Sequence, residues 1–254
     1  METGITVIIP CYNSEKTIGR CLDSIIETKY SNYEILLVND CSIDATKSII
    51  DEYIFNKNIK AKIISNKRNL GAGNSRNIGI EHITKEYVTF IDADDTITKT
   101  FFEDINIRIK GTNCDCVIYN ALVKDRNHCK RLSMFYGGRF TDGPISTKDA
   151  LVYTKGCTCG KVYNAKMIKG QGIRFGNIKR NEDLIFTKIA LSYCKNVEYL
   201  SKELYIYYDN ENSLTHNSSL LDTNNCYLAY QQIEASLRNR GFSTELHSIY
   251  FIEI

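Results

Sequence analysis

Three carboxylates stand together at the end of one apolar segment. Asp92, Asp94 and Asp95 directly follow the run from Tyr87 to Ile91. Like charges this close repel one another, so the cluster needs a counter-charge, most simply a hard divalent cation. Mg²⁺ and Mn²⁺ prefer carboxylate and phosphate oxygens and usually keep positions open for substrate phosphates. The spacing therefore indicates a metal site for a phosphate-bearing substrate, and the alternative is a solvated acidic turn that caps the following helix.

The first half of the chain predicts a regular frame for this cluster. Short apolar or β-branched runs predict four strands, at residues 5–9, 33–38, 62–65 and 87–91. Helical signals between them predict helices after Asn13 or Ser14, around 49–54 and over 74–83. Strands and helices that alternate in this way indicate a mostly parallel sheet that helices cover on both faces.

Polar residues follow each of these predicted strands. They lie at residues 10–12, 39–40, 66–69 and 92–95. In open α/β sheets, ligands bind outside the carboxyl ends of the strands. Four strand ends that all carry polar residues therefore predict a single binding site at this edge of the sheet.

The second half is less regular but continues the same domain. Helical patterns cover 101–109 and 182–193 and resume from Leu220, and strand-like runs lie at 116–119 and 204–208. The polar stretch 124–141 predicts a hairpin or an irregular excursion, and the chain stops on a short apolar tail, 249–254. Since no repeat or linker separates independent domains, we predict one domain followed by a helical C-terminal tail, 217–254.

Composition and charge describe an ordinary soluble globular protein. The 254 residues are 43% hydrophobic and 24% charged, and the net charge of +2 gives no reason to expect nucleic acid as a partner. No secretory signal precedes the first strand and no run approaches the ~18 apolar residues that span a bilayer, so we expect a cytoplasmic protein. The 10 cysteines suggest reduced, buried side chains, because the C-x-C pairs at 114/116 and 157/159 lack the second pair that a zinc site needs.

Two other enzyme classes use the same kind of sheet. A dinucleotide-dependent oxidoreductase needs G-x-G-x-x-G at the first strand–helix turn, and this turn, Pro10 to Ser14, contains no glycine. Gly71 and Gly73 come too late in the chain to replace it. A nucleotidyltransferase usually has a glycine- and lysine-rich loop after the first strand, which is absent here, but its acidic metal ligands keep it as an alternative.

Five short blocks follow one another along the chain: Val7–Asn13, Glu34–Asp44, Asn69–Asn77, Asp92–Asp95 and Asn181–Asp183. In this order and spacing the chain resembles the family 2 glycosyltransferases, inverting enzymes of the GT-A fold that build bacterial surface polysaccharides. The resemblance implies a GT-A α/β fold with a mostly parallel mixed sheet flanked by helices. It also implies that residues 1–100 form the nucleotide-sugar-binding half and 101–216 the acceptor-binding half.

The resemblance assigns several residues to the nucleotide. Tyr12 would stack on the uracil ring, and Asp40 would accept a hydrogen bond from the uracil N–H. Asp92 would contact the ribose, and Pro10 and Ala93 would lie beside the nucleotide. Simpler structural roles stay open, because Tyr12 could complete the core and Asp40 could form an Asx turn.

The resemblance also implies a metal ion and its ligands. Asp94 would bind a Mn²⁺ or Mg²⁺ ion that bridges the two phosphates, with Asp95 and His216 as further candidate ligands. A lone loop histidine, however, is more often merely exposed. Arg76 would sit near the diphosphate or brace the acidic cluster, since a guanidinium pairs with both. Glu15, expected in the first helical turn, is better explained by capping than by a ribose contact.

Asp183 is the candidate general base. An inverting transfer is a single in-line displacement, so one carboxylate must take the proton of the acceptor hydroxyl, opposite the leaving diphosphate. Glu182 would orient the site rather than transfer the proton. Because the pair opens a predicted helix, simple capping is the structural alternative.

The implied partners are a UDP-sugar donor and a glycan or lipid-linked glycan acceptor, in capsule, lipopolysaccharide or similar biosynthesis. Such acceptors allow weak attachment to the inner face of the membrane through the tail from Leu220, although packing on the core suits its apolar face better. A relative that binds nucleotide sugars without turnover is a further alternative, against which the presence of Asp94 and Asp183 argues. Cys159–Tyr163 resembles the segment before the acceptor region, but the chain has no tryptophan. The acceptor pocket, donor sugar and oligomeric state therefore stay open.

Overall fold

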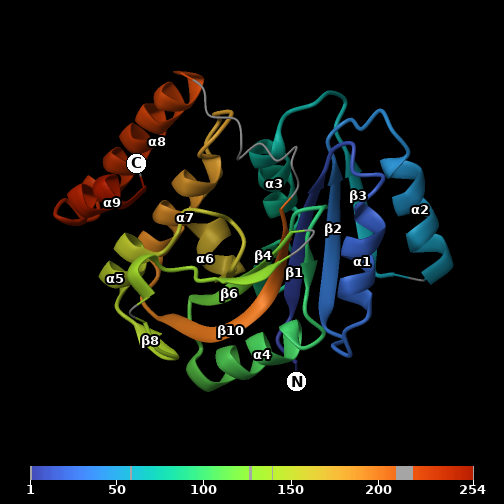
Figure 1. Cartoon of the computed structure of the whole chain (residues 1–254), viewed down its shortest axis with the longest axis horizontal. Coiled ribbons are helices and arrows are strands. Elements are labelled where there is room, and N and C mark those ends of the chain that lie inside the picture. The colour runs from blue at the N-terminus through green and yellow to red at the C-terminus, as the bar shows by residue number, and fades with distance from the viewer. Residues whose placement is uncertain (1, 58, 126–127, 139, 210–219, 254) are drawn as a thin grey trace.

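The first half of the chain folds as its apolar runs predict (Figure 1). The computed structural model describes residues 2–57, 59–125, 128–138, 140–209 and 220–253. The first four strands are all parallel and lie in the order β3-β2-β1-β4: β1 (Ile5–Cys11), β2 (Tyr33–Asn39), β3 (Ala61–Ser65) and β4 (Tyr87–Phe90). β1, β2 and β4 are largely buried, which explains why they read as continuous apolar runs.

The connections between these strands place helices on both faces of the sheet. α1 (Ile18–Ile26) and α2 (Thr46–Lys57) lead from β1 to β2 and from β2 to β3, whereas α3 (Ala72–Glu81) leads back to β4. The crossover through α3 therefore runs along the sheet in the opposite direction to those through α1 and α2. Since parallel crossovers are right-handed, this reversal of direction puts α3 on the face opposite α1 and α2. The reversal creates the topological switch point at which ligands of such sheets bind.

The first helix begins later than the polar residues before it suggest. α1 starts at Ile18, so the prediction that Asn13 or Ser14 caps it is wrong, and Glu15 lies outside its first turn. Asn13 adopts a left-handed backbone conformation (φ 48°), and its side chain accepts a hydrogen bond from Ile43 N at 3.0 Å. Residues 13–15 are bonded to the loop after β2 and to Thr46 at the start of α2. The sequence pattern cannot reveal this because the partners are distant along the chain.

In the second half, antiparallel strands join the parallel ones. β9 (Lys161–Asn164) runs antiparallel between β4 and β6 (Cys116–Lys124), and β10 (Val197–Tyr208) lies parallel to β6. β7 (Cys129–Leu132) forms with β6 the hairpin that was one alternative for residues 124–141. The short strands β5 (Thr96–Ile97) and β8 (Gly143–Ile145) pair antiparallel with β10. The sheet is therefore mixed, with parallel pairs among β1 to β4 and between β6 and β10, and with β9 antiparallel between the two sets.

The C-terminal helices pack back onto the domain. The helices after β4 are α4 (Phe101–Thr112), α5 (Thr147–Tyr153), α6 (Ala165–Gly170), α7 (Glu182–Tyr193), α8 (Leu220–Arg238) and α9 (Glu245–Glu253). α8 lies against α7 and α9 against α5, and they bury Ala229, Ile233 and Leu237. The apolar face of the tail is thus used for packing, as its spacing favours, and the predicted apolar tail is the end of α9.

The cysteines are free, as their spacing predicts. None of the ten forms a disulfide, and Cys129 is the one that is exposed, whereas the others are buried or half-buried. Burial raises the pKa of the Cys11 thiol. Burial and the neighbouring Cys11 together raise the pKa of the Cys21 thiol. These two thiols therefore act as small apolar side chains in the core between β1 and α1.

α3 packs so closely on β1 that no room is left for a side chain at Gly79. A Cβ atom there would lie 2.5 Å from Cγ2 of Ile8. We expect Gly79→Ala to lower the free energy of unfolding by about 1–3 kcal/mol, because overpacking a tight contact strains it. Urea denaturation measures this change.

Gly111→Ala in α4 is the matched control, since nothing lies within 4 Å of a Cβ at that position. There, alanine should leave the free energy of unfolding unchanged or raise it by up to about 1 kcal/mol. Equal effects of the two substitutions would contradict a tight α3–β1 contact.

Candidate active site

The carboxyl ends of the parallel strands meet at one edge. Cys11, Asn39 and Ser65 are register partners at the ends of β1, β2 and β3. The residues that follow them lie side by side, and Asp40 N donates to Cys11 O at 2.8 Å. β4 pairs with β1 and delivers residues 92–95 to the same edge. The polar strand ends predicted from the sequence therefore share one side of the sheet.

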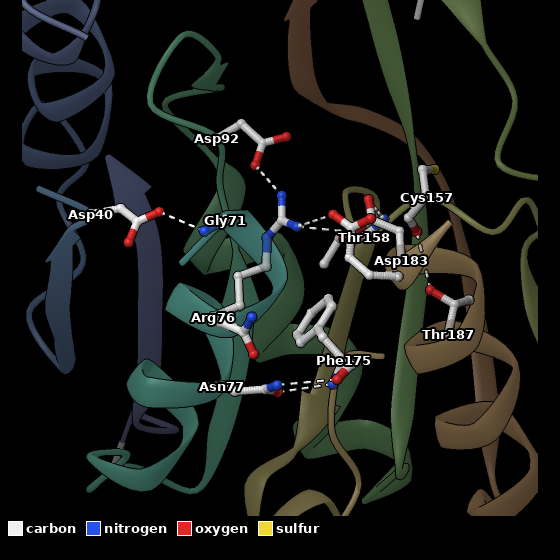
Figure 2. Close-up of polar contacts among 12 residues, drawn as sticks. Asp40, Gly71, Arg76, Asn77, Asp92, Cys157, Thr158, Phe175, Asp183 and Thr187 are labelled. Atoms are coloured by element: carbon white, nitrogen blue, oxygen red, sulfur yellow. Dashed lines mark hydrogen bonds and ion pairs between the residues drawn. The ribbon is translucent and has the colours of Figure 1, made fainter. Parts of the chain in front are cut away.

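Asp40 organises the loop that precedes α3. Its buried carboxylate accepts hydrogen bonds from Asn66 Nδ2 (2.7 Å), Leu70 N (2.9 Å) and Gly71 N (2.8 Å), the last of which Figure 2 shows. The Asx-type bond suggested for Asp40 is formed instead by Asn39, whose side chain accepts from the backbone N–H three residues on, at 3.1 Å. Asp40 thus fixes the loop from which α3 starts.

The other residues that the resemblance assigns to the nucleotide lie in or just after β1 and in the turn after β4. Tyr12 is 48% exposed just beyond the end of β1, so it does not complete the core. Glu15 is exposed, and its carboxylate accepts a hydrogen bond from the backbone of the loop after β2 at 3.0 Å. Pro10 lies within β1, and Ala93 is buried.

Arg76 lies at the centre of the site and is buried. Its guanidinium pairs with Asp92 at 2.6 Å and with Asp183 at 2.9 Å, and Glu182 lies at 3.6 Å (Figure 2). The ring of Phe175 supports it, with its centroid 5.3 Å from Cζ of Arg76. Burial acts to lower the pKa of Arg76, but the charges of Asp183 and Asp92 outweigh burial and raise that pKa above its usual value. Arg76 therefore stays cationic and joins the end of β4 to the start of α7.

Asp183 is held at both of its carboxylate oxygens. One oxygen accepts a hydrogen bond from Arg76, and the other accepts one from the backbone N–H of Thr158 at 3.3 Å. The side chain remains 31% exposed, so a substrate can reach it. A carboxylate has about four lone-pair positions, so these two contacts leave room for a further donor. The arrangement suits a group that accepts a proton from a bound hydroxyl.

Glu182 fills the narrow space between α7 and α3. A Cβ atom at Gly73 would lie only 2.8 Å from Cγ of Glu182, so glycine is needed at that position. Burial, followed by the negative charge of Asp183, raises the pKa of Glu182 to about 7. Glu182 is therefore placed to brace the helix start against α3.

The three carboxylates of the acidic turn have different surroundings. Asp95 is buried and accepts hydrogen bonds from Tyr205 Oη (2.6 Å) and Tyr208 N (2.9 Å). Burial and the neighbouring Asp92 raise the pKa of Asp95 to about 8, and the same two causes raise the pKa of the half-buried Asp94. The three carboxylates therefore do not form one solvated cluster. Residues at the end of β10 bind Asp95, and the guanidinium of Arg76 pairs with Asp92.

Asp92 and Asp94 are the carboxylates of this turn that reach the surface. Within the described residues, no group of three or more His, Cys, Asp or Glu side chains could hold a metal ion by itself. An open pair of hard oxygen ligands suits Mg²⁺ or Mn²⁺, which take further ligands from water and substrate phosphates. The raised pKa of Asp94 fits such an ion, because a nearby cation would stabilise the charged form. His216, a further candidate ligand, lies outside the described residues.

Three residues that build the site were missed by the sequence analysis. Arg20 in α1 donates to Asp94 O at 2.6 Å, and its guanidinium lies 3.6 Å from the ring centroid of Tyr208. Thr158 acts through its backbone N–H, which no side-chain pattern reports. Tyr205 is visible in the sequence only as part of a tyrosine-rich strand.

Comparison with known proteins identifies the family. The model of glycosyl transferase family 2 matches residues 6–157, more than half of the chain. The chain belongs to glycosyl transferase family 2. The EpsH protein of Bacillus subtilis (strain 168) is 31% identical over 214 residues, which cover 82% of this chain and 61% of EpsH.

Proteins of known structure are also similar to this chain. TarS of Staphylococcus aureus (strain Mu50), named a poly(ribitol-phosphate) β-N-acetylglucosaminyltransferase, is 29% identical over 206 residues, 80% of this chain and 35% of TarS. A crystal structure of TarS 1–349 with UDP-GlcNAc matches with a TM-score of 0.84 at 22% identity and covers 98% of this chain and 73% of that one. The mannosyltransferase PcManGT of Pyrobaculum calidifontis, in complex with GDP-Man and Mn²⁺, matches with a TM-score of 0.71 at 17% identity, 98% of this chain and 70% of that one. These matches confirm the GT-A fold.

Two further facts bear on how far the likeness extends. The chain spans less than two thirds of the length of EpsH and of TarS. Among the helices of the described ranges, none is long and apolar enough to cross a bilayer.

The raised pKa of Glu182 makes stability depend on pH. Its folded pKa of about 7 lies above the ordinary 4.5, so its contribution is fully present below pH 4.5 and is lost as the pH rises through 7. We expect Glu182→Gln to match the wild type near pH 5 and to be more stable at pH 8 by up to about 3 kcal/mol. Urea denaturation at the two pH values measures the difference.

Glu52→Gln on the exposed side of α2 is the control, and it should show no such change with pH. If the relative stability of Glu182→Gln did not grow between pH 5 and pH 8, the electrostatic description of the helix start would be wrong.

Proposed function

We propose that the chain is an inverting glycosyltransferase that moves a sugar from a UDP-sugar to a hydroxyl of a glycan acceptor, with Asp183 as general base. The placement of Asp183 carries the proposal, because its carboxylate is fixed on two sides, remains accessible and lies across Arg76 from Asp92. Membership of glycosyl transferase family 2 supports the reaction class. The UDP-GlcNAc in the structure of TarS supports a UDP-sugar as donor.

Asp183 performs the proton transfer in this proposal. As the acceptor oxygen attacks the anomeric carbon, Asp183 takes its proton, and the diphosphate leaves from the opposite face of the sugar. Arg76 and the backbone of Thr158 prevent the carboxylate from rotating, which keeps it in line with the attacking hydroxyl. The base and the acidic turn therefore keep a fixed separation.

Asp94 would hold a Mn²⁺ or Mg²⁺ ion against the donor diphosphate. When bound, the ion supplies the charge stabilisation that the leaving diphosphate requires. Asp95 positions the turn from behind, since Tyr205 and Tyr208 occupy its oxygens. The Mn²⁺ in the structure of PcManGT supports such an ion, and His216 stays a candidate ligand for it.

We assign the nucleotide to the edge formed by β1, β2 and β4. Tyr12 offers an exposed ring on which uracil can stack. Asp40 lies next to it and would accept the uracil N–H, and Asp92 would contact the ribose. The remaining residues assigned to this nucleotide edge are Pro10, Glu15, Arg76 and Ala93.

The acceptor is assigned to the half formed by residues 101–216, on the side of Asp183. We propose a glycan acceptor, free or lipid-linked, in the synthesis of a bacterial polysaccharide at the inner face of the membrane. The name of TarS, which specifies transfer to poly(ribitol-phosphate), supports a polymeric cell-surface acceptor.

Asp183→Asn tests the role of the base. We expect kcat for transfer to fall about 100-fold to 10,000-fold, because the amide cannot take the proton of the acceptor. UDP binding should change less than about threefold, since Asp183 lies on the acceptor side. UDP release is measured across a panel of nucleotide sugars with glycan acceptors, with Mn²⁺ and with a chelator.

Asp51→Asn, at an exposed position on α2 that pairs with Lys47, is the control and should keep full activity. UDP binding without turnover for any donor would favour a non-catalytic relative. Absence of UDP binding in the wild type would refute the proposal.

A further inference from the structure

Lys161 is a buried cation that binds the loop in contact with Asp183. It is the first residue of β9 and is 0% exposed. Its Nζ donates to the carbonyl oxygens of Cys157 (2.7 Å) and Cys159 (3.2 Å), and no ion pair joins it to a carboxylate of the described chain. Removing an ammonium group from water is costly unless hydrogen bonds replace the lost hydration. An apolar residue would fill this core position at a lower cost in free energy, so a lysine that binds two carbonyls here requires an explanation.

The two carbonyls flank the residue that holds Asp183. Residues 157–159 form a loop whose middle residue, Thr158, donates its backbone N–H to Asp183. Lys161 bonds to the carbonyls of the residues before and after Thr158 and so fixes the 157–158 and 159–160 peptide planes, the first of which carries the N–H of Thr158. Thr158 is itself buried, which leaves the loop little freedom once Lys161 is in place.

A second contact ties the same loop to the helix of the base. Thr187 lies one turn after Asp183 in α7 and donates its hydroxyl to Cys157 O at 3.3 Å (Figure 2). Cys157 O therefore accepts from β9 through Lys161 and from α7 through Thr187. The loop, the strand and the helix start form one hydrogen-bonded unit around Asp183.

We propose that Lys161 is a positioning residue for the general base. It holds the 157–159 loop so that Thr158 N–H engages one oxygen of Asp183, while Arg76 engages the other. This fixes which lone pairs of Asp183 face the acceptor hydroxyl and affects the transfer step without touching the donor. The inference rests on the proposed function of Asp183.

A role in catalysis and a role in stability alone predict different results. If Lys161 only filled the core, its loss would lower stability and leave the kcat of the folded molecules unchanged. If it positions Asp183, its loss lowers kcat while donor binding stays the same, because misplacing a reacting group by about 1 Å can cost about 100-fold in rate.

Lys188 provides a matched control. It is also 0% exposed, and its Nζ donates to the carbonyls of Leu151 (3.0 Å) and Thr154 (2.6 Å) at the end of α5. Neither carbonyl flanks Thr158. Lys161→Met and Lys188→Met therefore remove the same buried group from similar surroundings, one beside the base and one away from it.

The experiment compares both variants as full-length chains, below their melting temperatures. We expect both variants to have a lower melting temperature than the wild type. Lys161→Met should lower kcat for transfer about 10-fold to 100-fold at unchanged KM for the donor and unchanged Kd for UDP. Lys188→Met should keep kcat within about twofold of the wild type. Equal kcat values in the two variants would overturn the inference.

Thr187→Val decides the question if Lys161→Met does not fold. It keeps the shape of the side chain and removes one of the two donors to Cys157 O, so kcat should fall about fivefold with UDP binding unchanged. An unchanged kcat would then refute the positioning role. A wild type that transfers no sugar would refute the proposed function itself and the inference with it, whereas an active wild type with insensitive variants refutes only the inference.

Discussion

The charge of one buried guanidinium holds the two sides of the site together. Arg76 faces carboxylates from separate parts of the fold, with Asp92 at the end of β4 and Glu182 and Asp183 at the start of α7. Without a cation between them these groups would repel one another, and the helix start would have no electrostatic reason to lie against the sheet edge. The placement of Asp183 against the acidic turn therefore depends on the charge of this side chain.

Backbone and aromatic contacts turn that charge balance into a fixed geometry. The ring below Arg76, Phe175, stacks on Phe186 of α7 with centroids 4.1 Å apart. Asn77, the next residue of α3, bonds to both the N–H (2.8 Å) and the C=O (3.1 Å) of Phe175, as Figure 2 shows. The segment before α7 is thus fastened to α3 through Asn77 and to α7 through Phe186, which restrains the groups that pair with Arg76.

The part of the fold built from β1 to β4 can be read from the sequence, whereas much of the surroundings of Asp183 cannot. The first strands are apolar runs because the sheet buries them, and their polar ends fall in register. Asp183 could be placed at a helix start from its sequence block, and Arg76 could be placed near acidic groups, but not between two particular ones. β9 escaped prediction because four residues that begin with Lys161 match no strand pattern. Thr158 escaped because a backbone N–H leaves no trace in residue type.

The insertion of β9 also sets the order in which the molecule can assemble. Among the described strands, β9 is the one that joins β4 to β6, and it comes after both in the chain. During synthesis, the edges of β4 and β6 that face β9 therefore stay open until residue 164 has left the ribosome. An open edge is a template for pairing with another chain. The local β1 to β4 units can form early, but pairing across long separations is slow. A nascent chain that stalls before β9 would thus leave open the edges of β4 and β6 that face β9, which makes completion of this short strand a vulnerable step of folding.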